Sequence, residues 1–481
     1  MNNKFYIDQH GCAKNQTDGE LLCGFLTDAG FELTQNAEEA SFIIINSCGF
    51  IESAKKESID AIYSIKSAYP ESKLILAGCL SERYAELFNQ SIPELDGIFG
   101  NGDLSKIVDF MKNVLAGKRE TKVYPQEGIC YGKRPYLFNY KASAFVKITE
   151  GCSNNCSFCA IPIIRGPVRS RCVNDIVDEI NQLVQKGVYE INLIGQDLAA
   201  FEYVTSENKL LNDEQNSSKC SALAFLMKKI SLIQGDFIVR PLYIHPDHFN
   251  SDILEVMKKD NRFVPYFDIP FQSGDDKIIQ LMNRKGSFDK YVNLVEKIRS
   301  ELPGAVIRTT FLTGFPGETD KAAENTKNFL KKIDADWSGC FPYSREEDTP
   351  AYSFKNRVPA KIAKKRAQAL EEIQQEITET HLKKYVGKEL NILVEEIIEL
   401  GEQAEDSSEG LALGRAWFQA PEVDGCVVIR YEADDAFEAE KVVPGNVVTV
   451  KVLAVTGVDL DSRFVKLHKK ALNSDIKYIN L

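Results

Sequence analysis

The chain has 481 residues, a formal net charge of −12 and no apolar run long enough to cross a membrane. This size leaves room for two to four globular domains and excludes a small domain that depends on disulfides. Twelve cysteines, without a signal-peptide pattern after Met1, predict metal binding in the reducing cytoplasm and no membrane partner.

Strands and helices alternate over residues 1–135, which predicts an N-terminal domain with a doubly wound α/β fold. The segment Phe42-Ile-Ile-Ile-Asn46 has the continuous apolar run of a strand in a parallel sheet. The expected strands are residues 5–8, 42–46 and 73–77, and the expected helices are residues 17–29, 52–69 and 82–89.

A cysteine follows each of these strands, and we call Cys12, Cys48 and Cys79 the first cysteine trio. Ligands of open α/β sheets bind outside the carboxyl ends of the strands, so these thiols are expected to converge. The glycines beside them would let the backbone approach a bulky ligand. Free cysteines packed at strand ends are the alternative, but the repeated position favours an iron–sulfur cluster with one iron free of protein ligands.

A second cysteine trio, Cys152, Cys156 and Cys159, lies in a loop directly after the expected strand at residues 145–149. Three thiolates at this spacing can hold three corners of a four-iron cluster, which leaves one iron open for a substrate. A zinc site would need a fourth Cys or His nearby, and none of the five histidines is local. The sequence therefore predicts a second 4Fe–4S cluster.

Six strand–helix units are expected over residues 136–370, too few for a closed eight-stranded barrel. A partial (β/α)6 barrel fits this count, with its chemistry at the carboxyl ends of the strands. Polar residues at these ends are candidates for hydrogen bonds to a cofactor: Gln196, Gln272, Arg308 and Thr310, together with Asp197 and His245. The polar insertion at residues 205–219 is expected to be a surface loop.

Three arginines, Arg165, Arg169 and Arg171, follow the second trio closely. They are equally compatible with a place beside the cofactor and with surface salt bridges. The other six cysteines are expected to be structural: Cys23, Cys130, Cys172, Cys220, Cys340 and Cys426.

A helix expected at residues 361–384 leads into short strands that predict a small β-barrel over residues 385–470. Residues 387–467 carry seven Lys or Arg and seventeen Asp or Glu, a balance of −10. Such acidity suits a basic protein partner better than RNA, so direct nucleic-acid binding is not expected. Trp417 and Phe418 could stack on a partner, but core packing is the favoured interpretation.

The loop of the second trio, placed directly after an apolar strand, resembles the CxxxCxxC loop of the radical S-adenosylmethionine (SAM) superfamily. The segments Gly11-Cys-Ala-Lys-Asn-Gln-Thr-Asp18 and Asn46-Ser-Cys-Gly-Phe-Ile51 resemble the N-terminal domain of the methylthiotransferases. The sequences of these segments are most similar to the RimO-like branch of the family. The segment Gly414-Arg-Ala-Trp-Phe-Gln-Ala-Pro-Glu-Val-Asp-Gly425 resembles the TRAM domain of that branch.

This resemblance implies two 4Fe–4S clusters, one at each trio, and SAM as both methyl donor and radical source. It implies transfer of a methylthio group to the β-carbon of an aspartate in protein twelve of the small ribosomal subunit. The expected partners are that ribosomal protein, a sulfur donor, and an electron donor such as flavodoxin or ferredoxin.

Two other functions stay open at this point. The sequence Gln272-Ser-Gly resembles the one usual in the relatives that modify RNA, so Ser273 leaves a tRNA adenosine as an alternative substrate. A non-catalytic zinc or iron–sulfur scaffold is the alternative from another functional class, and six cysteines at strand ends argue against it.

Overall fold

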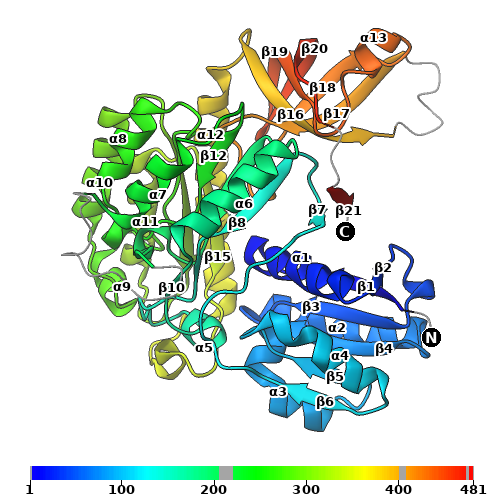
Figure 1. The fold of residues 1–481 in the computed structure, drawn as a ribbon. Coiled ribbons are helices and arrows are strands. Elements are labelled where there is room, and N and C mark those ends of the chain that lie inside the picture. The colour runs from blue at the N-terminus through cyan, green and yellow to red at the C-terminus, as the bar shows by residue number, and fades with distance from the viewer. Residues whose placement is uncertain (1–2, 205–219, 400–407, 473–475, 480–481) are drawn as a thin grey trace.

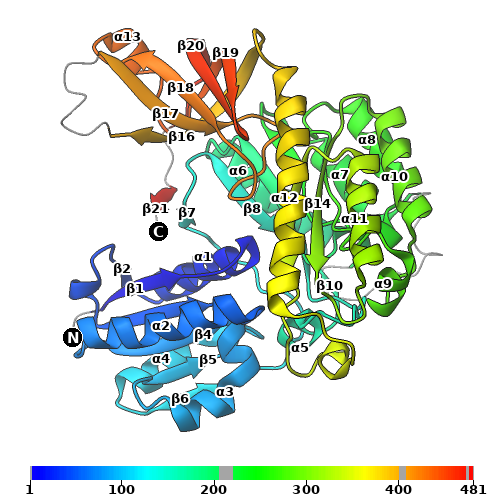
Figure 2. The same ribbon diagram turned by 180° about the vertical axis from the view of Figure 1, so that it is seen from behind.

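The computed structural model describes residues 3–204, 220–399, 408–472 and 476–479. The insertion expected at residues 205–219 lies outside these residues. Figures 1 and 2 show three parts: an N-terminal sheet with its helices in blue and cyan, a central group of strands and helices mainly in green, and C-terminal strands in orange and red.

The N-terminal sheet has six strands in the order β2-β1-β3-β4-β5-β6, and all neighbouring strands are parallel. The strands are β1 (Lys4–Gln9), β2 (Glu32–Leu33), β3 (Phe42–Ser47), β4 (Lys73–Gly78), β5 (Gly97–Phe99) and β6 (Glu120–Lys122). Helices α1 (Ala13–Asp28) and α4 (Ile107–Leu115) pack on one face, and α2 (Glu52–Ala68) and α3 (Cys79–Ser91) pack on the other. This confirms the doubly wound α/β fold. The additional strands β2, β5 and β6 have only two or three residues each, too few for a sequence pattern.

Helix α1 begins at Ala13, four residues before the start expected at residue 17. Residues 13–20 are all buried although most of them are polar. They are buried because other parts of the chain supply partners: Asp18 pairs with Lys147, and Glu20 pairs with Arg134. A polar segment without an apolar stripe gives no signal of a buried helix, so the sequence alone misplaces this start.

The central part contains six strands in two parallel sheets, β12-β11-β8 and β13-β14-β15, joined by an isolated bridge between Val239 and Phe263. The strands are β8 (Ser143–Lys147), β11 (Glu190–Ile194), β12 (Ile238–Pro241), β13 (Tyr266–Asp268), β14 (Val306–Thr313) and β15 (Trp337–Pro342). The helices are α5 (Ile161–Arg165), α6 (Val173–Gln185), α7 (Ala222–Ile230), α8 (Asp252–Lys259), α9 (Asp276–Leu281), α10 (Phe288–Glu301) and α11 (Asp320–Ile333).

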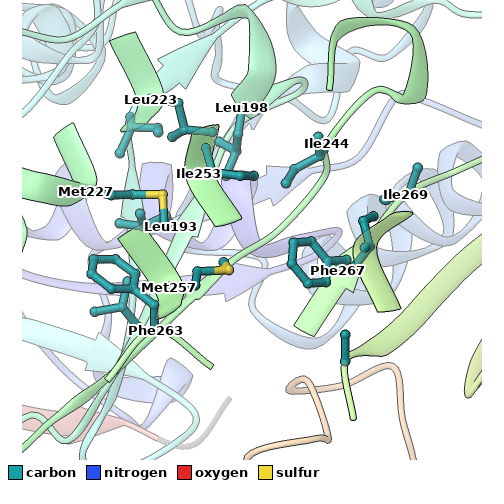
Figure 3. Packing of buried hydrophobic residues seen from close by; sticks show 14 of the residues in the cluster. Leu193, Leu198, Leu223, Met227, Ile244, Ile253, Met257, Phe263, Phe267 and Ile269 are labelled. Carbon is teal, nitrogen blue, oxygen red and sulfur yellow. The ribbon is translucent and has the colours of Figure 1, made fainter. Parts of the chain in front are cut away.

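This arrangement confirms the partial barrel. Buried side chains of the strands and of the surrounding helices interdigitate, for example Leu193 with Met227 and Met257 with Phe263 (Figure 3). Helix α1 packs against β8 at one edge of the barrel, so the N-terminal part lies directly against the central one. A short antiparallel pair, β9 (Thr149–Glu150) and β10 (Arg169–Ser170), brackets the loop of the second trio.

Helix α12 (Ala360–Lys383) runs along the central part to the C-terminal strands (Figure 2). These strands form a closed barrel in the order β16-β17-β18-β20-β19, as expected for a TRAM-like barrel. They are β16 (Glu389–Ile398), β17 (Glu409–Arg415), β18 (Val427–Glu432), β19 (Val447–Thr456) and β20 (Asp459–Lys469), with the short helix α13 (Ala436–Ala439). Strand β21 (Lys477–Ile479) pairs with β7 (Tyr136–Phe138) and ties the end of the chain to the segment before β8. No helix in the described residues is both long enough and apolar enough to span a bilayer.

The aromatic pair in the C-terminal barrel joins it to the central barrel. Phe418 is buried and stacks on Tyr385 with ring centroids 4.2 Å apart, which confirms core packing for this residue. The carbonyl of Phe418 accepts a hydrogen bond from Trp337 Nε1 at 2.9 Å, and the carbonyl of Trp417 accepts one from Arg240 at 2.6 Å.

Candidate active site

The first cysteine trio converges at one edge of the N-terminal sheet. Strands β1, β3 and β4 are neighbours in that sheet, and Cys12, Cys48 and Cys79 follow their carboxyl ends. The loops touch: a Cβ on Gly11 would lie 3.0 Å from the Cβ of Cys48, and a Cβ on Gly49 would lie 2.8 Å from the carbonyl oxygen of Cys79. Only glycine at both positions lets these loops lie so close to each other, as the sequence suggests.

The second trio lies in the loop between β9 and α5, and side chains of the barrel hold this loop. Asp197, which follows β11, accepts hydrogen bonds from Asn154 Nδ2 at 3.0 Å, His248 Nδ1 at 2.8 Å and the N–H of His245 at 3.1 Å. Burial disfavours the charge of Asp197, but these hydrogen bonds outweigh it and lower the pKa of the carboxyl group. On the other side of the loop, Asn283 donates to the carbonyl of Asn155 at 2.9 Å.

His245 lies beside a sulfur of the second trio, with its Nε2 4.0 Å from the Sγ of Cys156. Its Nδ1 accepts the N–H of Asp247 at 3.2 Å, which places the proton of the neutral ring on Nε2. Burial and then the charge of Arg284 lower the pKa of His245 to about 3, so the neutral ring is the form present at pH 7.

The cysteine side chains fit iron–sulfur clusters better than a single metal ion. In the described part of the chain, no three His, Cys, Asp or Glu side chains are close enough to share one ion. In a cluster each thiolate binds a different iron, so such close grouping is not required. Burial and a neighbouring cysteine raise the pKa of both Cys48 and Cys159 to about 12, so these thiols are protonated in the protein alone, and a bound metal would supply the positive charge that stabilises their thiolates.

A cavity of about 1030 Å³ lies between the N-terminal and central parts, and residues next to a cysteine of each trio line it. From the N-terminal part it is lined by Phe50 and Ile51, which follow Cys48, and from the second trio by Phe158, between Cys156 and Cys159. Gln272 and Thr310 line it from the barrel, so two of the four predicted cofactor contacts face this space. Gln272 has a left-handed backbone (φ 69°), held by hydrogen bonds to the backbone of β14, a conformation common at functional sites.

The other two predicted cofactor contacts have different surroundings. The Oε1 of Gln196 is buried without a hydrogen-bond partner among the described residues, so it could accept a hydrogen bond from a bound group. Arg308 is buried between two carboxylates, with Asp268 at 3.1 Å and Asp424 of the C-terminal barrel at 3.4 Å. These ion pairs make Arg308 a contact between the barrels, a position the sequence does not reveal.

A smaller cavity of about 320 Å³ opens on the first trio. Residues 421–423 of the C-terminal barrel line it opposite Cys12 and Cys48, so all three parts of the chain surround this trio. Lys14 lies nearby with its Nζ 3.0 Å above the ring of Tyr243, and burial lowers its pKa to about 8. No sequence signal assigns a role to Lys14 or to residues 421–423 beyond the motifs that contain them.

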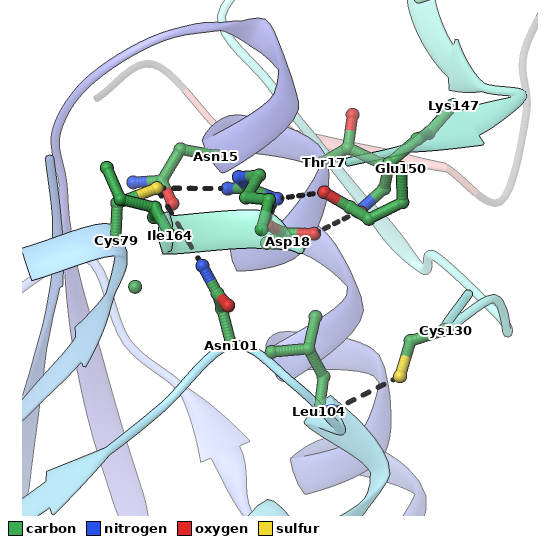
Figure 4. Close-up of polar contacts among 12 residues, drawn as sticks. Asn15, Thr17, Asp18, Cys79, Asn101, Leu104, Cys130, Lys147, Glu150 and Ile164 are labelled. Carbon is green, nitrogen blue, oxygen red and sulfur yellow. Dashed lines mark hydrogen bonds and ion pairs between the residues drawn. The ribbon is translucent and has the colours of Figure 1, made fainter. Parts of the chain in front are cut away.

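A buried charge network fixes the two trios relative to each other (Figure 4). Lys147 pairs with Asp18 and lies 2.5 Å from Glu150, and Arg165 lies 2.6 Å from Glu150 and 2.8 Å from Asp18. All four side chains are at most 9% exposed, so each charge depends on its partners. Glu150 immediately precedes the loop of the second trio, whereas Asp18 belongs to the helix that follows Cys12.

A second set of ion pairs holds the Cys48 loop from outside. Glu346, in the segment after β15, binds Arg83 of α3 at 2.7 Å and Lys55 of α2 at 3.1 Å. Arg83 also donates to the carbonyl of Gly49 at 3.1 Å. The central part therefore supports the first trio at the residue that follows Cys48.

Comparisons with known proteins match this three-part structure. Residues 4–100 match the uncharacterized protein family UPF0004, residues 146–330 the radical SAM superfamily and residues 386–465 the TRAM domain. Among solved structures, the radical S-adenosylmethionine methyltransferase TsrM from Kitasatospora setae aligns with a TM-score of 0.51 at 12% identity, over 73% of this chain and 74% of that one. At this identity the likeness supports the fold alone.

Relatives of known name match over most of the chain. The ribosomal protein uS12 methylthiotransferase RimO of Treponema denticola is 50% identical over 95% of this chain and 99% of its own. The protein of the same name from Natranaerobius thermophilus is 37% identical over 87% of this chain and 91% of its own. The chain therefore belongs to the RimO family of radical SAM methylthiotransferases.

Proposed function

We propose that this chain adds a methylthio group to the β-carbon of an aspartate in the small-subunit ribosomal protein uS12. The names of its relatives support this substrate, and the radical SAM match supports an iron–sulfur cluster and SAM. The observation that carries the proposal is the cavity lined both by Phe50 and Ile51, which follow Cys48, and by Phe158, which precedes Cys159. Sulfur delivery and radical formation require separate sites that share one substrate, and a substrate in this cavity would lie close to both trios.

In this proposal Cys152, Cys156 and Cys159 hold one 4Fe–4S cluster, and Cys12, Cys48 and Cys79 hold the other. When bound, a reduced cluster and SAM supply a carbon radical able to remove hydrogen from an unactivated carbon. Gln196, Gln272 and Thr310 are proposed to bind SAM from the ends of the barrel strands. Arg308 keeps the C-terminal barrel in place beside them through Asp268 and Asp424.

Part of the cavity wall is apolar. Phe50, Ile51, Phe158, Leu312 and Phe341 line the cavity, so a substrate bound there would displace water from this surface. Water exclusion limits side reactions of a reactive intermediate and strengthens the electrostatic contacts that orient the substrate. The electron and the sulfur come from outside: a reductant such as flavodoxin or ferredoxin and a separate sulfur donor complete the proposal, which places the reaction in the cytoplasm with the ribosome.

The residue that favours a tRNA substrate has a structural role. Ser273 is buried, its hydroxyl lies 3.3 Å from that of Thr326, and it accepts the N–H of Asp275. Unlike its neighbour Gln272, Ser273 does not line the cavity of about 1030 Å³. Its identity therefore gives no reason to prefer RNA.

Mass spectrometry of ribosomal proteins and tRNA from cells lacking this gene tests the substrate. We expect the methylthio mass increment to disappear from one aspartate-containing peptide of uS12 and to persist in tRNA. Complementation with the intact gene should restore it, whereas complementation with Cys156→Ala should not. Loss of the increment from tRNA, with uS12 unchanged, would contradict the proposal.

A further inference from the structure

Arg165 comes from the central part of the chain but contacts a cysteine of the N-terminal part. It ends α5, six residues after Cys159, and would be expected to serve the second trio. Its Nη2 instead donates to the Sγ of Cys79 at 3.2 Å. Figure 4 shows the surroundings of this sulfur, with Asn101 near it and Asp18 and Glu150 of the buried charge network on the far side of the guanidinium.

The contact is well defined because the guanidinium is held on its other side. Nη1 of Arg165 binds both Glu150 and Asp18, and the side chain is 3% exposed. Water therefore cannot replace Arg165 at the sulfur. A second polar group near this atom is Asn101, whose Nδ2 lies 3.9 Å from it.

The four charges of the buried network beside Cys79 cancel one another. Lys147 and Arg165 contribute two positive charges, and Asp18 and Glu150 contribute two negative ones. A cluster gains one negative charge when it is reduced. Hydrogen bonds to cluster sulfurs and nearby positive charge stabilise that added charge, and this is one of the ways in which proteins set cluster potentials.

We propose that Arg165 is a positioning residue for the cluster of the first trio: its guanidinium fixes the Cys79 sulfur and raises the reduction potential of that cluster. The inference rests on the proposed function, which assigns a cluster to Cys12, Cys48 and Cys79. It adds a physical link between the trios, because the same guanidinium also binds Glu150, two residues before Cys152.

The other two arginines of the segment do not share this role. Arg171 is also buried, but it binds Glu179 at 2.6 Å and the carbonyl of Lys147 at 2.9 Å. Arg169 donates to the backbone carbonyls of Gly128, Arg165 and Pro167. Arg171 is therefore a matched control: a buried arginine in the same segment that has no hydrogen bond to a sulfur in the described part of the chain.

The test uses the full chain with Cys152, Cys156 and Cys159 replaced by Ala, so that only the first trio can hold a cluster. In this background we compare Arg165→Lys, Arg165→Gln, Arg165→Met and Arg171→Met after anaerobic reconstitution. Redox titration followed by electron paramagnetic resonance gives the midpoint potential, iron release to a chelator gives cluster retention, and circular dichroism checks folding.

We expect a lower potential in Arg165→Met and Arg165→Gln, a smaller decrease in Arg165→Lys, and no change in Arg171→Met. Iron release should accelerate in the same order, so a variant that holds its cluster poorly still provides a result. Unchanged potential and unchanged iron release in folded Arg165→Met would overturn the inference and leave the proposed function intact. Absence of any cluster in the background protein would instead refute the assignment of the first trio, and the inference with it.

Discussion

The two cysteine trios are assembled by different means. The second trio spans residues 152–159 of one loop, whereas the first draws on three loops between residues 12 and 79. A few side chains of the barrel, such as Asp197 and Asn283, hold the second trio locally. The first depends on the order of β1, β3 and β4 in the sheet. It also depends on two contacts from the central part: Arg165 binds Cys79, and Glu346 binds Arg83 next to the Cys48 loop. Damage to the interface between the two parts should therefore affect the first trio and spare the second.

Cysteine substitutions should have the largest effects on activity and should separate the roles of the two trios. Cys156→Ala is expected to abolish both SAM cleavage and methylthio transfer, because it removes a ligand of the radical-forming cluster. Cys48→Ala should abolish methylthio transfer but retain reductive cleavage of SAM. Chromatography with mass spectrometry measures 5′-deoxyadenosine and modified uS12 in the same reaction. Loss of SAM cleavage in a folded Cys48→Ala protein with half of its iron would contradict separate roles.

Replacement of Glu346 should weaken the interface between the two parts. Glu346→Ala leaves Arg83 and Lys55 without their buried partner, which costs about 3 kcal/mol for a pair of this kind. We expect a lower thermal unfolding midpoint and faster iron loss from the first trio than from the second. Glu347→Gln, at the exposed neighbouring position, is the control: its amide oxygen can keep the hydrogen bond from Tyr84, and it should change stability by less than about 0.5 kcal/mol. Equal effects of the two substitutions would contradict the role of Glu346 in holding the first trio.

Replacement of Asp197 should have the opposite effect, with faster iron loss from the second trio than from the first. Asp197→Ala removes the acceptor of Asn154 and of the His245 N–H, so it leaves buried donors unpaired at a cost of roughly 2 kcal/mol. Iron should be lost faster from the second trio, while the first keeps its electron paramagnetic resonance signal. Asp178→Ala, on the exposed side of α6, serves as the control. Preferential loss from the first trio would show that the barrel does not hold the loop as described.

A smaller effect is expected away from both trios, at His381 of α12. A hydrogen bond that His381 donates to Asp336, together with the charges of Asp336 and Asp334, raises the pKa of His381 above its ordinary value of 6.5. A folded pKa above the unfolded one stabilises the fold fully below about pH 6.5, and this stabilisation disappears as the pH rises through the raised pKa. We expect the free energy of unfolding to fall by on the order of 1 kcal/mol over this interval, and His381→Gln to reduce the fall. An identical pH profile in both proteins would contradict this assignment.

Much of this organisation is predictable from local patterns. The apolar segment around Phe42 and the cysteine after each strand are sufficient to predict the doubly wound sheet and the convergence of the first trio. The apolar strand before Cys152 is sufficient to predict the start of the barrel. These predictions succeed because strand order in parallel sheets obeys simple rules and because cysteine spacing is directly visible.

The remaining features depend on contacts between distant residues. The early start of α1 follows from partners such as Lys147 that are far away in the sequence. The sequence leaves Arg165 equally compatible with a place beside the cofactor and with a surface salt bridge, whereas the direction of α5 brings its buried guanidinium to Cys79. In the same way, nothing local reveals that Arg308 binds Asp424 or that Ser273 is buried against Thr326.

The number of clusters tests the central claim most directly. Anaerobically reconstituted wild-type chain should bind about eight irons with two distinguishable signals, because each trio holds one 4Fe–4S cluster. Substitution of either trio by Ala should halve the iron and remove one signal. A wild-type protein that binds only about four irons, all lost when the second trio is replaced, would contradict the account.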